Sequence, residues 1–164
     1  MPPPDPTAYQ SLLDSIRQMT ASAVTLADLQ IHVVESIARE LPYYNWVGFY
    51  MLDPSDPEML VLGPFRGDPT PHVRIPVHQG ICGAAVASRE TIVVDDVNQD
   101  PRYLSCSIST RSEIVVPIWA GGQVVGEIDI DSHITAAFDS ADREFLEQVA
   151  QIVGAFISRS ARAL

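Results

Sequence analysis

Two cysteines and a short row of acidic residues are the groups in this chain best suited to chemistry. Cys82 and Cys106 are the only thiols among its 164 residues, while Glu113, Asp129 and Asp131 stand in apolar stretches that are typical of buried strands. A carboxylate beside apolar sequence needs a partner or keeps its proton, because burial disfavours its charged form. The pattern predicts a small, acid-lined pocket with a thiol nearby.

The acids follow the two-residue period of a strand. Asp129 and Asp131 alternate with Ile128 and Ile130, so the two aspartates share one face and the isoleucines the other, and Glu127 joins the acidic face. Such a row can be solvated. Alternatively, because like charges repel, a cation lies between the acids or one of them keeps its proton. The residues themselves leave these alternatives open.

Cys106 lies in a polar segment between Tyr103 and Arg111. A thiol in a loop is more often exposed than one in a helix or strand, but it reacts only as a thiolate, which nearby positive charge favours. Arg102 and Arg111 are the local candidates for that charge. The alternative is an unreactive loop cysteine.

Cys82 stands at the predicted start of a short helix, with glycines on both sides. A helix N-terminus lowers the pKa of a thiol, whereas flanking glycines suit close packing around a small buried sulfhydryl. A disulfide between Cys82 and Cys106 is a further alternative, because the sequence does not give their Cα separation.

Other familiar chemistry is not indicated. His72 and His78 could join the two cysteines around a metal ion, but their spacing matches no common zinc pattern, and we expect no metal. The chain has no phosphate loop, dinucleotide fingerprint or Ser-His-Asp signature. Trp46 and Tyr50 share a strand face, where they either belong to the core or line a pocket for an alkyl chain or an ammonium group.

The hydrophobic pattern predicts the elements that position these residues. Helices are expected near 7–20, at 26–41 after a Thr25 cap, at 81–88, and after an Asp139 cap. Strands are expected at 45–52, 59–65, 73–77, 91–94, 114–119 and 124–130. Hairpin turns between neighbouring strands predict an antiparallel sheet with helices packed on it, an α+β fold. We expect a single domain over 1–164, with a flexible tail at 1–6 and a long loop at 95–110.

The charge and composition of the chain limit the classes of partner that it can bind. The net charge is −11 and no Lys/Arg stripe is present, which argues against nucleic acid and an anionic membrane surface. The acidity suits solubility, or a cationic or zwitterionic ligand. No stretch approaches the ~18 apolar residues of a membrane span. Two cysteines make no disulfide framework, so we expect a reduced, cytoplasmic protein.

Several motifs in order resemble the GAF domain: Gly80-Ile-Cys-Gly, Asp95-Asp-Val, Val115-Val-Pro, Val125-Gly and Phe138-Asp. A second set is similar to the free methionine-(R)-sulfoxide reductases, which are single-domain GAF enzymes: Asn45-Trp-Val-Gly-Phe-Tyr, Leu60-Val-Leu-Gly-Pro-Phe, Val73-Arg-Ile-Pro, Cys106, Ser112-Glu-Ile-Val and Asp129-Ile-Asp-Ser. The likeness runs from about residue 8 to 158.

This resemblance implies roles for the residues singled out above. Cys106 would be the attacking thiolate, and Cys82, which matches a second cysteine of the family, a possible resolving thiol. The substrate-binding residues would be Glu113, Asp129, Asp131, Trp46 and Tyr50, with the acids holding the ammonium of free methionine sulfoxide and its sulfoxide oxygen. The resemblance implies no bound cofactor, reduction by thioredoxin or another thiol, and a homodimer.

Two positions depart from the family pattern. His72 occupies the place of a third cysteine that commonly serves as the resolving thiol, and Glu127 stands where the family tends to be apolar. The alternative function is a non-catalytic GAF module that senses a small ligand. A further alternative is a redox-sensing interaction protein that uses Cys82 and Cys106.

Overall fold

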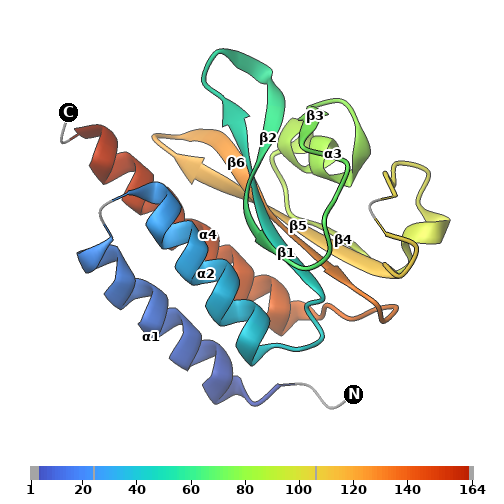
Figure 1. Cartoon of the computed structure of the whole chain (residues 1–164), viewed down its shortest axis with the longest axis horizontal. Coiled ribbons are helices and arrows are strands. Elements are labelled where there is room, and N and C mark those ends of the chain that lie inside the picture. Colours follow the sequence, from blue (N-terminus) through green and yellow to red (C-terminus); the bar gives the residue numbers. More distant parts are fainter. Residues whose placement is uncertain (1–3, 24, 106, 163–164) are drawn as a thin grey trace.

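The fold is a six-stranded antiparallel sheet with helices on both faces (Figure 1). It is known from a computed structural model, which describes residues 4–23, 25–105 and 107–162. The helices are α1 (Pro6–Ser22), α2 (Leu26–Glu40), α3 (Gly80–Ser88) and α4 (Ser140–Arg162), with a 3-10 turn at Val97–Gln99. The strands are β1 (Trp46–Asp53), β2 (Asp56–Arg66), β3 (Arg74–Pro76), β4 (Ile92–Val94), β5 (Ser112–Ala120) and β6 (Gln123–Ser132).

The strands lie in the order β3-β2-β1-β6-β5-β4, and every neighbouring pair is antiparallel. The predicted α+β class and the predicted hairpins are confirmed. In the β5–β6 turn, Gly121 and Gly122 have φ values of 59° and 77°, as a tight hairpin turn requires. Strand β2 is longer than predicted at both ends, because Asp53 and Asp56 already pair across the first turn.

Local capping sets the helix ends. The Thr25 hydroxyl accepts a hydrogen bond from the Asp28 N–H, and the Asp28 carboxylate accepts one from the Thr25 N–H, which confirms the predicted cap. Helix α1 begins at Pro6, so the predicted tail of residues 1–6 is wrong at that residue. Asp5 caps the helix by accepting a hydrogen bond from the Thr7 N–H, and proline suits the first helical turn.

The two faces of the sheet are covered differently. Helices α2 and α4 pack on one face and α1 packs on these two helices. The apolar residues of alternating strand positions complete that core, among them Ile114, Val116, Ile128 and Ile130. The short helix α3 packs on the other face, where it contacts β5, β6 and the edge strands β3 and β4 (Figure 1). Helix α4 contacts β5 on one side and α1 and α2 on the other. None of the described helices has the length and apolar character needed to span a membrane.

Candidate active site

The acidic face of β6 lies beneath α3, not in solvent. Glu127, Asp129 and Asp131 are only 0%, 3% and 4% exposed. Glu113, on β5, lies opposite Asp131 in the strand register and is 5% exposed. The alternative of a solvated acidic face is therefore wrong, and the sheet brings together the three acids predicted to form the pocket.

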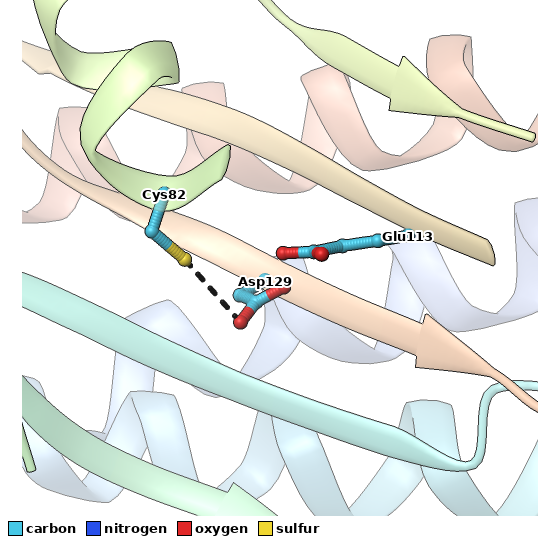
Figure 2. A group of neighbouring side chains, drawn as sticks. All are labelled: Cys82, Glu113 and Asp129. Carbon is cyan, nitrogen blue, oxygen red and sulfur yellow. Dashed lines mark hydrogen bonds between the residues drawn. The ribbon is translucent and has the colours of Figure 1, made fainter. Parts of the chain in front are cut away.

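Helix α3 supplies a thiol to this acidic group. The Cys82 sulfhydryl donates a hydrogen bond to Oδ2 of Asp129 across 3.4 Å, and Figure 2 shows the sulfur directed toward the carboxyls of Asp129 and Glu113. Burial raises the thiol pKa well above its usual value, and the negative charges of the acids raise it further. The predicted lowering by a helix N-terminus is outweighed, so Cys82 stays a neutral thiol at neutral pH.

The carboxyls themselves are held away from their ordinary protonation state. Burial raises the pKa of Asp129 to about 6, and its contacts with Glu113 and Cys82 limit that rise. The pKa of Asp131 is raised well above the usual value by burial and by the charge of Asp129. Burial likewise raises the pKa of Glu127. One member of such a group keeps its proton at neutral pH unless a cation joins it.

Several of these buried oxygens have no hydrogen-bond partner among the described residues. They are both carboxyl oxygens of Glu127 and the Oδ1 atoms of Asp129 and Asp131. A buried polar atom left without a partner costs about 1–3 kcal/mol, and native proteins contain few of them. The group is therefore suited to a ligand that donates hydrogen bonds and carries positive charge.

An aromatic wall stands beside the acids. Trp46 and Tyr50 are 8% and 1% exposed, and their rings stack with centroids 6.2 Å apart. The Trp46 indole N–H donates a hydrogen bond to the Asp68 carbonyl at 3.0 Å, and the Tyr50 hydroxyl donates one to the His72 carbonyl at 2.7 Å. The rings belong to a core cluster, as the first alternative for this pair expected, and they also border cavities, while a contact with an alkyl chain or an ammonium group stays a prediction.

Two small cavities follow the acidic strand face. The first, of about 10 Å³, is lined by Tyr50, His72, Ile75, Gly80, Ile81, Cys82, Leu104, Glu113 and Asp129. The second, of about 110 Å³, is lined by Asn45, Trp46, Gly67, Asp68, Thr70, Ser107, Thr110, Asp131 and His133. All five predicted substrate-binding residues thus border one cavity or the other.

Cys106, the predicted nucleophile, lies outside the described residues. Its described neighbours border the cavities, with Leu104 at the first and Ser107 at the second. Arg102, one predicted source of positive charge, is paired with Asp100 at 2.7 Å. The other, Arg111, donates a hydrogen bond to the Ile108 carbonyl at 3.0 Å.

The two histidines considered as metal ligands, His72 and His78, lie in different surroundings. His72 borders the first cavity, and its Nε2 donates a hydrogen bond to the Ser105 carbonyl at 3.0 Å. His78 is exposed and lies 4.0 Å from Glu58. Within the part of the chain that the structure describes, the metal set considered from sequence is not assembled. A different ligand set is, because atoms of Cys82, Glu113 and Asp129 lie within 4.8 Å of one another.

Comparison with known proteins matches this architecture to the GAF domain over residues 7–157. The free methionine-R-sulfoxide reductase of Saccharomyces cerevisiae is 37% identical over 89% of this chain and 79% of its own length. That of Escherichia coli is 38% identical, over 81% of this chain and 76% of its own. The chain belongs to the GAF domain family and, within it, to the free methionine-R-sulfoxide reductases. The resemblance stated from sequence and the prediction of an enzyme are thereby confirmed.

A solved structure of the same reductase family supports this assignment. The free methionine-R-sulfoxide reductase from Neisseria meningitidis, determined in complex with its substrate, aligns with a TM-score of 0.91 at 32% identity. The alignment covers 100% of this chain and 96% of that one.

Sequence reasoning missed several residues around the second cavity. Asn45, Asp68, Thr70, Thr110 and His133 all line it. They stand at strand ends or in loops, where polar residues are common, so no periodic pattern set them apart. His72 was noted only as a substitution or a metal ligand, and its hydrogen bond beside the Cys106 segment depends on a contact across 33 positions of sequence.

Proposed function

We propose that this chain reduces free methionine-(R)-sulfoxide to methionine, with Cys106 as the attacking thiolate. The observation that carries the proposal is the group of buried carboxyls with unpartnered oxygens, which lies beside an aromatic wall. An ammonium group would supply both the hydrogen bonds and the positive charge that these oxygens need. The named relatives and the substrate complex of the Neisseria meningitidis enzyme support this substrate.

The acids would recognise the amino-acid end of the substrate. Asp129 and Asp131 each have an unpartnered oxygen, and Glu113 lies close to both of them in the sheet. Trp46 and Tyr50 would contact the alkyl chain or the face of the ammonium. A methionine sulfoxide inside a polypeptide lacks the free ammonium and carboxylate, so a pocket closed around both ends selects the free amino acid.

The chemical step transfers oxygen from the substrate to sulfur. The Cys106 thiolate attacks the sulfoxide sulfur and forms an S–S bond, while the sulfoxide oxygen takes a proton. The protonated oxygen then bonds to the Cys106 sulfur as the S–S bond and the S–O bond of the substrate break, so methionine leaves and Cys106 becomes a sulfenic acid. A carboxyl held neutral by burial and by its neighbours suits the role of proton donor, and the raised pKa values of Asp129 and Asp131 support that role for this group.

Two thiols then return Cys106 to its reduced form. The first condenses with the sulfenic acid to a disulfide and releases water, and the second reduces that disulfide. Cys82 could supply the first thiol, followed by thioredoxin, or external thiols could supply both. Cys82 is 5% exposed and lies on the buried side of α3, so in the first route the Cys106 sulfur has to reach it inside the pocket.

The proposal is tested by supplying racemic free methionine sulfoxide with dithiothreitol and following each epimer by chiral chromatography. We expect selective loss of the R epimer, abolished in Cys106→Ser and retained in Cys82→Ser. Turnover that persists in Cys106→Ser would contradict the assigned nucleophile. Tight binding of the amino acid without turnover in the unmodified protein would favour the ligand-sensing alternative instead.

The role of Cys82 in recycling is tested by changing the reductant. If Cys82 resolves the sulfenic acid, Cys82→Ser slows turnover with thioredoxin more than turnover with dithiothreitol. Equal effects on the two rates would exclude Cys82 as the resolving thiol.

A further inference from the structure

The acid pocket contains a set of ligand atoms that a metal ion requires. Cys82 from α3, Glu113 from β5 and Asp129 from β6 each offer one atom, and the three atoms lie within 4.8 Å of one another (Figure 2). All three residues are at most 5% exposed. From this arrangement we propose that the reduced pocket binds one divalent cation of the zinc class through the Cys82 sulfur and the carboxylates of Glu113 and Asp129.

The geometry is close to that of a tetrahedral site. Zinc lies about 2.3 Å from a thiolate sulfur and about 2.0–2.2 Å from a carboxylate oxygen, which places the two ligand atoms about 3.6 Å apart. The Cys82 sulfur and Asp129 Oδ2 are already 3.4 Å apart. Only a small closure of the third ligand is needed, and a water can complete the open fourth position.

A second observation points to a missing ligand at the same place. Oδ1 of Asp129, a residue that is 3% exposed, has no hydrogen-bond partner among the described residues. The three ligand residues also border the cavity of about 10 Å³. That space is about the size of one water-sized sphere. A single ion seated there would partner the buried carboxylates and offset their mutual repulsion.

The donor set selects the kind of ion. A thiolate suits zinc and other borderline cations, whereas magnesium and calcium prefer oxygen ligands alone. The sulfur binds after losing its proton, so the site carries three negative charges against two positive charges on the ion. The cation is therefore held by charge as well as by geometry.

Together with the proposed function, on which this step rests, the cation site implies that a metal ion regulates the reductase. The cation would occupy the place that we assign to the substrate ammonium and would compete with free methionine sulfoxide. The reduced pocket would then be inhibited reversibly by zinc. Binding itself does not depend on the reductase activity and can be measured without substrate.

Cobalt is the probe, because a thiolate bound to Co²⁺ gives a charge-transfer absorption in the near ultraviolet. The full chain, reduced and freed of excess thiol, is titrated with CoCl₂ and then with zinc. We expect the band to appear with one equivalent and to vanish on zinc addition. It should persist in Cys106→Ser, which removes the other thiol, and be lost in Cys82→Ser.

Carboxylate variants complete the test. Glu113→Gln and Asp129→Asn should weaken Co²⁺ binding by more than the roughly 10–100-fold that loss of an outer-shell partner costs. Glu58→Gln, an exposed carboxylate near His78, should leave it unchanged and serves as the matched control. Circular dichroism checks that each variant is folded. No band in the unmodified protein, or a band that survives in folded Cys82→Ser, would overturn the site.

Competition is measured separately by steady-state kinetics. Zinc should raise KM for free methionine-(R)-sulfoxide and leave kcat unchanged. A cobalt band without any effect on KM would refute the competition. A protein that binds cobalt but never reduces the sulfoxide would count against the proposed function and leave the cation site standing.

Discussion

Two regions of the molecule bury carboxyl groups, and they differ in the hydrogen-bond partners that they supply to the carboxyl oxygens. At the start of α4, Asp142 is 2% exposed and accepts hydrogen bonds at Oδ1 from the hydroxyls of Tyr9 (2.8 Å), Tyr43 and Tyr44 (2.6 Å). Its Oδ2 accepts a hydrogen bond from the Asp139 N–H at 2.9 Å. Both oxygens of this carboxyl are therefore fully partnered.

Across the sheet, three buried acids of β6 keep oxygens without such partners among the described residues. Oδ1 of Asp129, Oδ1 of Asp131 and both oxygens of Glu127 accept no hydrogen bond within the described part of the chain. The comparison teaches that burial alone does not reveal function. The partnered carboxyl ties α1, α4 and the segment after α2 together, whereas the carboxyls with unpartnered oxygens are the ones that we propose to bind a ligand.

The largest effect on the comparison should come from Asp129→Asn. This change removes the charge and the titration at the centre of the pocket with little change in shape. We expect kcat/KM for free methionine-(R)-sulfoxide to fall about 10²–10⁴-fold, the usual loss for a general acid. Chemical denaturation should show no loss of stability. A variant with activity within a few-fold of the parent would contradict the role of this acid.

Asp142→Ala should show the opposite behaviour. It leaves three tyrosine hydroxyls without their shared acceptor, so we expect the free energy of unfolding to fall by about 3–5 kcal/mol. At a temperature where the variant is folded, kcat should be unchanged. Urea denaturation and steady-state kinetics measure the two quantities. A large loss of kcat in the folded variant would contradict the purely structural role of Asp142.

The pH dependence of the free energy of unfolding tests the burial of the pocket acids without any mutation. The pKa of Asp129 rises from 3.8 to about 6 on folding, so its neutral form stabilises the native state below about pH 4, and that contribution is lost as pH rises through about 6. The raised pKa values of Glu127 and Asp131 act in the same direction. The free energy of unfolding should therefore fall between about pH 4 and the folded-state pKa values.

Glu127→Gln sharpens this prediction, because it removes one buried titrating group and keeps the side-chain size. We expect the variant to be more stable than the parent at pH 8 and to differ little from it at pH 4, because burial penalises only the charged form of Glu127. Urea denaturation at the two pH values gives the difference. Equal gains at both would show that Glu127 does not titrate in this range.

Tyr9→Phe should give the smallest effect. It removes one of the three hydroxyl donors to Oδ1 of Asp142 and leaves the ring against Phe145, so we expect a loss of about 1 kcal/mol in the free energy of unfolding. Thermal and urea denaturation measure it. A loss as large as that of Asp142→Ala would mean that the three hydroxyls act as one unit.

Much of the fold could be predicted from local patterns. The Thr25 capping box and the Gly121-Gly122 turn depend on neighbouring residues, so the sequence shows them directly. The alternation along β6 correctly placed Glu127, Asp129 and Asp131 on one face. Strand order and helix placement, by contrast, depend on contacts between distant segments and could not be read from periodicity.

The burial and the protonation of the site residues were harder to predict. Parity gave the face of the acids but not their burial, because it is α3 that covers them. Burial raises the pKa of Cys82, so of the two alternatives left open for this thiol the small buried sulfhydryl holds and the lowered pKa of a helix start does not. The sequence did not single out Asp142, since the three tyrosines that bind it come from distant positions. The resemblance supplied the role of Cys106, which remains a prediction.

Binding of substrate analogues to Cys106→Ser tests most directly whether the unpartnered carboxyls hold an ammonium group. The measurement is isothermal titration with free methionine-(R)-sulfoxide and with its N-acetyl derivative, which lacks the ammonium charge. If the carboxyls hold an ammonium group, the free amino acid binds and the acetylated one does not bind detectably. Equal binding of the two ligands would contradict it.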